Sequence, residues 1–392
     1  MSDLANVFMS NLKLRGLKMV STVYHIGPHA KSFTYESGLQ GKFEQFLKDF
    51  DIAKYIDKDE TVPLKIHLGG KGAFRTIRPQ FVKQVVQAVK NIPAKPFVTD
   101  SVRIPAYEYL EVAKEAGYNH LTLDAPVVIA DGMYGKDSLK SRAGELLGDV
   151  YIASALYEAK SMVVLTHVKG HIQAVLGGAI KNISMGGVSN ESHHGDWHEG
   201  RGKMHFLMGD IMEWDEDRCI LCYDCMKVCP AECITFPDNI YTVDKDKCWR
   251  CGRCARVCPE DAIHVPVTHE KFMKAIAEGA NAVASTFEPN RVIYISFLTE
   301  MQPECDCMPV AENPVVQDQG ILISDDPVAI DTATLDILSN VDTLGGSRAE
   351  GIKKKDGWDI FSLLHQKDGR LQVIEAEKLG LGTMNYKIEK IG

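Results

Sequence analysis

The sequence predicts an α/β fold, with a largely parallel sheet covered by helices on both faces and interrupted by a small inserted module. Three observations predict it. Short apolar, β-branched runs alternate with helical patterns, as in parallel sheets. The same alternation resumes near the end of the chain. Between these two parts, nine of the eleven cysteines fall between Cys219 and Cys258, where the pattern is of another kind.

Composition and charge limit the class of protein. The chain has 392 residues, 45% hydrophobic and 25% charged, which are ordinary globular values. With 44 Lys and Arg against 53 Asp and Glu, the formal charge is −9, so we expect no nucleic-acid partner. No secretory signal is recognisable, and no apolar run approaches the roughly 20 residues that span a bilayer. We therefore expect a cytoplasmic protein without a membrane partner.

The elements before the cysteine-rich region follow in order. Short apolar runs predict buried strands at residues 62–68, 96–99, 126–130 and 161–166. A helix is predicted from Pro79, because the following apolar residues recur on one helical face and proline favours the first helical position. Further helices are predicted at residues 107–116 and 144–159.

The elements after the cysteine-rich region repeat this alternation. A helix is predicted at residues 270–285, strands at 291–297 and 320–324, and a helix at 327–338. The chain is thus divided into a first part of the host domain (1–212), an inserted module (213–267) and a second part of the host domain (268–392).

The module contains an internal repeat of cysteines. Each copy has the spacing C-x2-C-x2-C-x3-C-P, starting at Cys219 and again 29 residues later at Cys248. This run is typical of bacterial proteins with two [4Fe-4S] clusters, in which the fourth cysteine ligates the other cluster. Paired zinc sites are the alternative, but zinc has no use for this repeated run. Cys233 is a further cysteine, interpreted as a packing residue or, less favoured, a regulatory thiol.

The module therefore resembles an α+β two-cluster ferredoxin. The resemblance implies one [4Fe-4S] cluster on Cys219, Cys222, Cys225 and Cys258, and a second on Cys248, Cys251, Cys254 and Cys229.

Histidines and glycines gather in the host domain before the module. Six of the thirteen histidines lie between His167 and His205. We predict a pocket lined by the basic and imidazole groups Lys169, His171, Lys181, His193, His194 and His198. Gly177 and Gly178 would let the backbone approach a ligand there. The alternative is a polar surface loop in which His193 and His194 have no function.

Two further groups follow the module. Cys305 and Cys307 are one residue apart, so they could bind a cofactor or a soft metal, cycle as a dithiol, or simply pack. Asp325, Asp326 and Asp331 lie at a predicted strand-to-helix turn, where α/β sheets bind ligands, although Asp326 could be only a helix N-cap.

Several host motifs carry a family resemblance. The stretches LKIHLGG, FVTD, APVVIADG, THVKGH, GGAIKN, CDC and DDPVAID resemble the iron-sulfur-containing branch of the family called domain of unknown function 362. The resemblance implies a host α/β domain with an embedded two-cluster ferredoxin, and no particular reaction.

A second, shorter resemblance concerns His171, Gly177, Gly178 and Lys181. They are similar to a run in the nickel-pincer lactate racemase family, whose lysine carries the cofactor and whose histidines bind nickel or move protons.

Three functions are compatible with these features. The first is an oxidoreductase in which two [4Fe-4S] clusters relay electrons from a partner such as a ferredoxin or flavodoxin to the predicted pocket and a small-molecule substrate. The second is an electron carrier or docking protein without chemistry of its own. The third is a metallocentre maturation or metal-handling factor. A further metal or organic cofactor would favour the first or the third.

Overall fold

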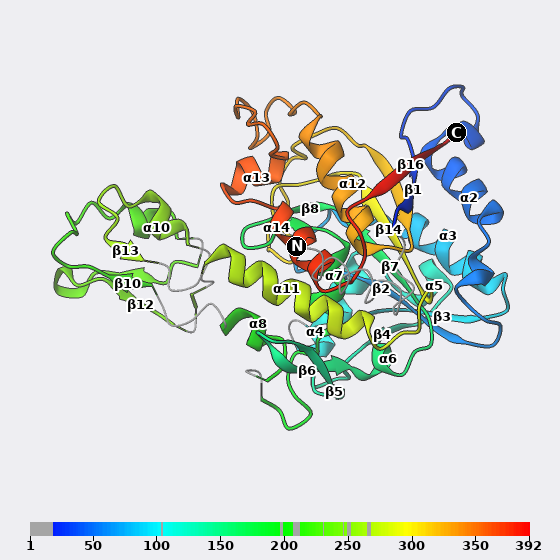
Figure 1. The fold of residues 1–392 in the computed structure, drawn as a ribbon, viewed down its shortest axis with the longest axis horizontal. Helices are drawn as coiled ribbons and strands as arrows, with labels where there is room; N and C mark the ends of the chain where they lie inside the picture. The colour runs from blue at the N-terminus through cyan, green and yellow to red at the C-terminus, as the bar shows by residue number, and fades with distance from the viewer. Residues whose placement is uncertain are drawn as a thin grey trace, which may run out of the picture.

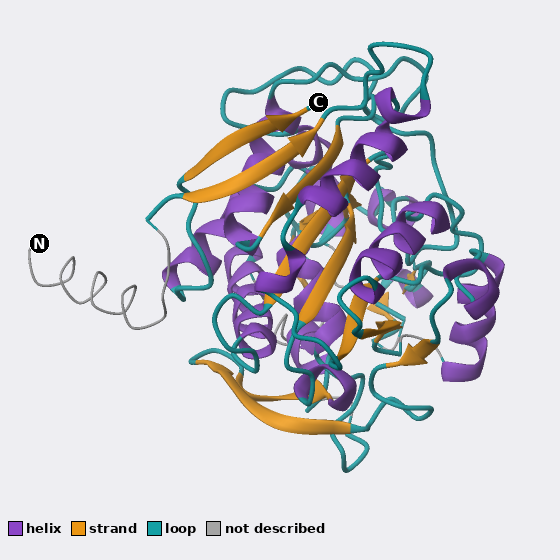
Figure 2. Ribbon diagram, turned by 90° about the vertical axis from the view of Figure 1, so that its right-hand side faces the viewer, coloured by secondary structure: helices purple, strands orange, loops and turns teal. Residues whose placement is uncertain are grey.

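The computed structural model describes residues 19–102, 105–196, 199–206, 212–229, 231–245, 247–248, 252–264 and 268–392. Its main feature is an eight-stranded sheet in the host domain (Figures 1 and 2). In spatial order the strands are β16 (Tyr386–Ile391), β1 (Ser21–Ile26), β15 (Gly320–Ser324), β14 (Val292–Leu298), β7 (Met162–His167), β2 (Thr61–Ile66), β3 (Lys95–Asp100) and β4 (Val127–Ile129).

The sheet is largely parallel, as predicted. Only β15 runs antiparallel to its neighbours, β14 and β1. The other neighbouring pairs are parallel. The central strands are mostly apolar because both faces are covered, and every residue of β14 is buried.

Helices cover both faces and enclose two hydrophobic cores. Along β7 the side chains alternate between the cores, since Val163 and Leu165 belong to one and Met162 and Val164 to the other. On the first face lie α2 (Leu39–Asp49), α3 (Pro79–Lys90), α4 (Ala106–Glu115) and α5 (His120–Leu123). On the second lie α7 (Ala179–Gly187), α11 (His269–Ala284), α12 (Pro327–Ser339), α13 (Ile360–His365) and α14 (Arg370–Lys378). The predicted α/β class is confirmed.

One predicted helix, at residues 144–159, is wrong. Strand β5 (Ser138–Gly144) pairs with β6 (Gly148–Ala153) in a hairpin, and the segment contains its turn and its second strand. The short helix α6 (Ser154–Tyr157) follows. Gly148 has a positive φ of 66°, which allows the tight turn. The buried carboxylate of Glu278, on α11, accepts the backbone N–H groups of Leu146 (3.0 Å) and Leu147 (2.7 Å). A tertiary contact therefore stabilises the turn against the local helical pattern.

The remaining host elements are short, apart from the two missed strands β1 and β16. They are the hairpin of β8 (Lys169–His171) and β9 (Val175–Gly177), α8 (Gly202–Phe206), and the 3-10 turns η1 (Tyr35–Ser37) and η2 (Ile52–Lys54). None of the helices formed by the described residues combines the length and apolar character needed to cross a bilayer.

The described part of the cysteine-rich module, between residues 213 and 264, projects from one end of the host domain (Figure 1). In it β10 (Glu213–Trp214) pairs with β13 (Ile263–His264), and β11 (Ile234–Thr235) with β12 (Thr242–Val243). The repeat is visible in the backbone. Both α9 (Asp224–Lys227) and α10 (Arg253–Val257) are preceded by a left-handed residue, Tyr223 or Gly252, 29 positions apart. The 3-10 turn η3 (Pro237–Asn239) lies between β11 and β12.

Candidate functional site

A cavity of about 630 Å³ lies at the carboxyl ends of the parallel strands. The chain places β3 and β4 on one side of β2 and then returns with β7 on the other side, so the order reverses between β2 and β7. Ligands of open α/β sheets bind at such a reversal. We call this the host cavity. Its charged, imidazole and thiol lining consists of Lys65, His67, Asp100, Lys169, His171, Lys181, Arg201, His205, Lys245, Cys248 and Cys307.

Asp306 anchors the loop that carries the two cysteines after β14. Its carboxylate is fully buried and accepts from Lys169 Nζ (2.9 Å), His167 Nδ1 (2.9 Å) and Gln302 Nε2 (3.1 Å). Burial alone would raise the pKa of Asp306, but His167 and Lys169 hold it below its usual value. His167 Nε2 faces the carbonyl oxygen of Thr299 (2.9 Å), so each ring nitrogen lies next to a hydrogen-bond acceptor.

A second buried carboxylate, Asp100 at the end of β3, orients His67. Asp100 binds His67 Nδ1 (3.1 Å), Lys65 Nζ (3.0 Å) and the Tyr109 hydroxyl (2.6 Å). Although burial opposes it, Lys65 and His67 hold the pKa of Asp100 below its usual value, so it is a carboxylate. His67 therefore donates from Nδ1, and its Nε2 is directed elsewhere.

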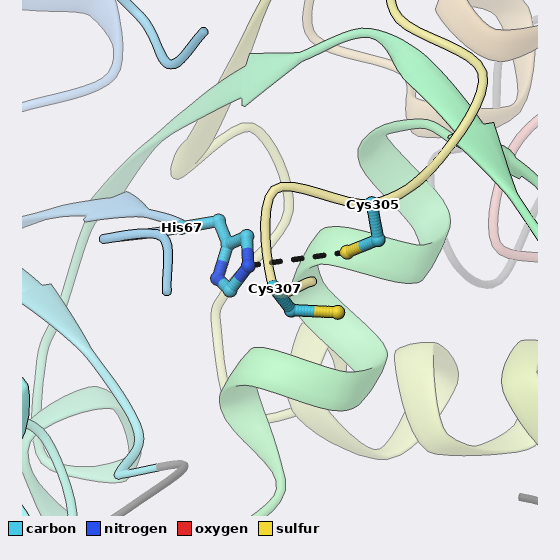
Figure 3. Close-up of side chains that lie close together, drawn as sticks. All are labelled: His67, Cys305 and Cys307. Atoms are coloured by element: carbon cyan, nitrogen blue, oxygen red, sulfur yellow. Dashed lines mark hydrogen bonds between the residues drawn. The ribbon is translucent and has the colours of Figure 1, made fainter. Parts of the chain in front are cut away.

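His67 Nε2 faces the two thiols. In Figure 3 the His67 ring points toward Cys305, and Cys307 lies beside them. The distance from His67 Nε2 to Cys305 Sγ is 3.9 Å, and the ligand atoms of His67, Cys305 and Cys307 all lie within 4.8 Å of one another. Lys181 Nζ lies 3.6 Å from Cys305 Sγ. The contact with Cys307 and then the charge of Lys181 lower the pKa of Cys305 well below its usual value, against the effect of burial.

His171 is held as a neutral ring. Its Nδ1 accepts the backbone N–H groups of Gln173 (3.1 Å) and Ala174 (2.9 Å), so Nε2 carries the proton. Burial lowers its pKa well below the usual value of histidine. His171 is therefore suited to donate a hydrogen bond from Nε2 to a ligand.

Gly177 and Gly178 line the host cavity as predicted, but each is required by a neighbouring side chain of the protein rather than by a ligand. A Cβ atom at Gly178 would lie 2.5 Å from Asp331 Oδ1, and one at Gly177 would lie 3.1 Å from Lys169 Cε. Asp331 accepts the N–H groups of Ala179 (2.8 Å) and Ile180 (2.9 Å) and so caps α7. The lack of a side chain at Gly178 thus leaves room for the carboxylate of Asp331, and the lack of one at Gly177 leaves room for the aliphatic part of Lys169.

The host cavity is positively charged. Five of its lining residues are Lys or Arg, and Asp100 is its only carboxylate among the described lining residues. Lys65 is neutralised by Asp100 and Lys169 by Asp306. Lys181, Arg201 and Lys245 add further positive charge to the lining, which favours a negatively charged ligand.

The structure brings most of the predicted pocket residues together. Lys169, His171, Lys181, Gly177, Gly178 and Cys307 line the host cavity, and Cys305 is buried beside it. His193 and His194 are exposed, stack on each other with ring centroids 3.7 Å apart, and do not line the cavity. His198 lies outside the described residues.

One predicted set of cluster ligands shares a cavity in the module. Cys219, Cys222, Cys225 and Cys258, from both copies of the repeat, line it together with Trp214. We call this the module cavity. The buried indole N–H of Trp214 has no hydrogen-bond partner among the described residues.

Three cysteines of the other predicted set lie among the described residues. Cys248 lines the host cavity, Cys254 is buried in the module core, and Cys229 Sγ lies 3.5 Å from Cys233 Sγ. Cys251 lies outside the described residues.

The sequence-based list of site residues missed Lys65, His67, Asp100, Tyr109, Arg201, His205 and Lys245. Lys65 and His67 end one predicted strand and Asp100 ends the next, so polar residues directly after adjacent parallel strands were the available signal.

The three carboxylates of residues 325–331 are structural. Asp326 caps α12 by accepting from Val328 N and Ala329 N (2.9 Å each), Asp331 caps α7, and Asp325 accepts from the Tyr55 hydroxyl (3.2 Å). The ligand-binding interpretation of this turn is wrong, because β15 is antiparallel and ends at the opposite edge of the sheet.

Comparison with known proteins gives one family. The family described as domain of unknown function (DUF362) matches residues 62–336. No curated protein sequence matches the chain. Among solved structures, the lactate racemase apoprotein from Thermoanaerobacterium thermosaccharolyticum aligns with a TM-score of 0.32 and 12% identity, over 71% of this chain. The aligned region spans about half (51%) of that protein.

Proposed function

The chain belongs to the DUF362 family, and we propose that this member is an iron-sulfur oxidoreductase that reduces a small anionic substrate in the host cavity. The single observation that carries the proposal is the place of Cys248. This residue belongs to a predicted cluster ligand set and also lines the cavity that contains Lys169, His171 and Lys181.

The cysteines of the module fit two [4Fe-4S] clusters. In the first set, four thiols converge on the module cavity, where Trp214 offers an N–H donor that a cluster sulfur could accept. In the second set, Cys229, Cys248, Cys251 and Cys254 would be the ligands. Buried thiols form much of the module core, which includes Cys225, Cys233 and Cys254. When bound, the clusters would supply electrons one at a time.

The charges of the host cavity support an anionic substrate. The positive charges of Lys181, Arg201 and Lys245 in the lining favour the binding of a carboxylate or phosphate group. His171 Nε2 carries a hydrogen and can donate a hydrogen bond to the bound substrate. The substrate would take up two electrons in single steps, together with two protons from water. A reduced ferredoxin or flavodoxin would supply the electrons.

The exposed surface of the module supports a protein partner. Ile220, Met226, Ile240 and Val257 are large apolar residues with exposed side chains on this small unit. Such side chains are suited to a transient contact with a redox protein. A simple electron carrier would also have such a surface, but it would not need the charged cavity.

The first experiment is a metal and sulfide inventory of the protein purified without oxygen. We expect about eight irons and eight sulfides per chain. Changing Cys225→Ala or Cys254→Ala should each remove about one cluster's share of the iron. Cys233→Ala, at a cysteine outside both predicted sets, is the matched control and should keep all of it. Zinc without sulfide, or full iron in both ligand variants, would contradict the assignment.

The second experiment separates an enzyme from a carrier. The dithionite-reduced protein is mixed with a panel of small organic acids and phosphate esters, and reoxidation is followed by visible absorbance. We expect at least one compound to speed reoxidation. Lys181→Ala and His171→Ala should abolish this effect while keeping the iron, and His193→Ala should not. Equal rates in all four proteins would favour the carrier.

A further inference from the structure

Three potential metal ligands converge at the host cavity from distant parts of the chain. His67 follows β2, whereas Cys305 and Cys307 belong to the loop after β14, 238 positions later for Cys305. Their ligand atoms lie within 4.8 Å of one another. Cys305 is fully buried, and His67 and Cys307 are partly exposed to the cavity. None of the three belongs to the cluster ligand sets of the module.

The orientation of His67 is that of a metal ligand. Its Nδ1 donates to Asp100 at 3.1 Å, and Lys65 and Tyr109 fix that carboxylate in turn. A carboxylate bound to one ring nitrogen leaves the lone pair of the other nitrogen free for a metal and makes it more basic. That nitrogen, Nε2, faces Cys305 Sγ.

The loop brings both thiols close to His67. Asp306, between them, is held inside the protein by Lys169, His167 and Gln302. Cys305 points toward the His67 ring and Cys307 lies beside them, with the three ligand atoms all within 4.8 Å of one another (Figure 3). The backbone of Gly70 also packs closely against this loop, because a Cβ atom at Gly70 would lie 2.8 Å from the carbonyl oxygen of Cys307. The three ligands are thus held in place by charged contacts and close packing.

We propose that His67, Cys305 and Cys307 bind a single divalent metal ion that prefers thiolate and imidazole ligands, with Zn²⁺, Co²⁺ and Ni²⁺ as the matching class. Two sulfurs and one nitrogen fill three positions of a tetrahedral site, and catalytic sites of this kind keep the fourth open. Here the open position faces the host cavity. Lys181 Nζ lies beside the site, 3.6 Å from Cys305 Sγ.

The open coordination position of the proposed metal ion indicates which class of molecule the site would bind. A substrate oxygen could complete the coordination while Lys181, Arg201 or Lys245 binds the rest of an anionic molecule. The proposed substrate is therefore a small carboxylate or phosphate ester with an oxygen donor beside its charged group. The metal site is formed by residues of the host domain alone, so its test does not depend on the presence of the iron-sulfur clusters.

The test loads the full-length protein with Zn²⁺. Protein purified without oxygen is treated with a chelator, incubated with Zn²⁺ and freed of unbound metal. Zinc and iron are then counted per chain. We expect one zinc per chain in addition to any cluster iron. X-ray absorption at the zinc edge should show two sulfur neighbours at about 2.3 Å and at least one nitrogen at about 2.0 Å.

Variants locate the site. Cys307→Ala, His67→Ala and the double variant Cys305→Ala/Cys307→Ala should each weaken Zn²⁺ binding at least ten-fold, with iron content unchanged. Asp100→Asn keeps the shape of the carboxylate but not its charge, and should weaken binding about 10-fold to 100-fold. The controls are His193→Ala, at an exposed histidine outside the cavity, and Cys233→Ala. Both should bind Zn²⁺ as the parent protein does.

Several results would overturn the site. A zinc with four sulfur neighbours would belong to the module, and unchanged Zn²⁺ binding by the double cysteine variant would exclude the host ligands. A reduced protein that takes up no Zn²⁺, Co²⁺ or Ni²⁺ would leave Cys305 and Cys307 as a dithiol. Bound zinc with the expected ligands in a sample without iron would reject the proposed function and keep the metal site.

Discussion

His365 shows how a single buried group depends on its partners. It lies at the end of α13, and its Nε2 faces the carbonyl oxygen of Pro303 at 2.9 Å, just before the cysteine loop. Because a carbonyl oxygen only accepts, Nε2 carries a proton. Burial penalises the charged ring and lowers the pKa of His365 to about 3. The neutral ring therefore stabilises the contact between α13 and the loop.

This lowered pKa predicts a pH dependence of stability. The unfolded state binds a proton near the ordinary histidine pKa of about 6.5, and the folded state does not. The contribution of the neutral His365 ring to the free energy of unfolding is complete above pH 6.5 or so, and it is lost as the pH falls from about 6.5 toward 3. At pH 5.5 the loss should be about 1 kcal/mol.

Chemical denaturation at pH 8 and pH 5.5 measures this loss. His365→Gln, which keeps a donor but cannot titrate, should show a smaller drop in stability between the two pH values. His193→Gln, at an exposed histidine, should behave as the parent protein. An equal drop in all three proteins would show that His365 does not contribute.

At the scale of elements, α7 joins the sheet to the site. Its first two N–H groups are capped by Asp331 from α12, its first turn carries Lys181 toward Cys305, and Gly186 makes room for Lys65. Asp331 has its pKa raised to about 7 by burial, with the two N–H groups opposing this effect. The position of Lys181 therefore depends on how closely α7 and α12 pack.

A methyl group at Gly178 should disturb this packing. The backbone there (φ −99°, ψ −166°) is one that alanine adopts, so the cost comes from the contact with Asp331 alone. Gly178→Ala should destabilise the protein by about 1–3 kcal/mol in chemical denaturation. Gly27→Ala is the control, because a Cβ atom there meets nothing within 4 Å.

The cause can be checked with a second change. In a protein that already carries Asp331→Ala, the cost of Gly178→Ala should shrink, since the colliding carboxylate is gone. An unchanged cost in that background would show that another contact is responsible.

At the scale of the whole molecule, charged contacts fasten the cysteine-rich module to the host domain. Arg253 of α10 binds Glu304 Oε1 at 2.9 Å, and Arg348 of the host binds the same oxygen at 3.1 Å. Arg256 donates to the carbonyl oxygen of His365. Glu304 directly precedes Cys305, so the module is attached to the loop that helps to form the host cavity.

Loosening this attachment should be measurable by hydrogen exchange. Arg253→Gln removes the charge that binds Glu304, and backbone amides of α10 and of the loop before Cys305 should exchange about five-fold faster, the ratio for about 1 kcal/mol. Arg218→Gln is the matched control, because the one ion pair of Arg218 among the described residues is with the exposed Asp261 within the module, at 3.9 Å. Equal exchange in both variants would mean that other contacts hold the module.

The sequence was sufficient for features set by local pattern. Apolar runs predicted β2, β3, β4, β7, β14 and β15, and helical periodicity predicted α3, α4, α11 and α12, all within a few residues. It was insufficient for the segment 144–159, where buried Glu278 of α11 stabilises a turn. It also missed β1 and β16, which pair with each other at one edge of the sheet.

For the site, the sequence by itself determined the repeated cysteine run and the basic, glycine-rich segment that carries Lys169, His171 and Lys181, because these are patterns of neighbouring residues. Only the tertiary structure decided which distant groups meet. Parallel strands bring their carboxyl ends to one edge, so His67, Asp100 and the loop of Cys305 converge although they are far apart in the chain. The same geometry leaves His193 and His194 on the surface and the carboxylates after the antiparallel β15 at the other edge.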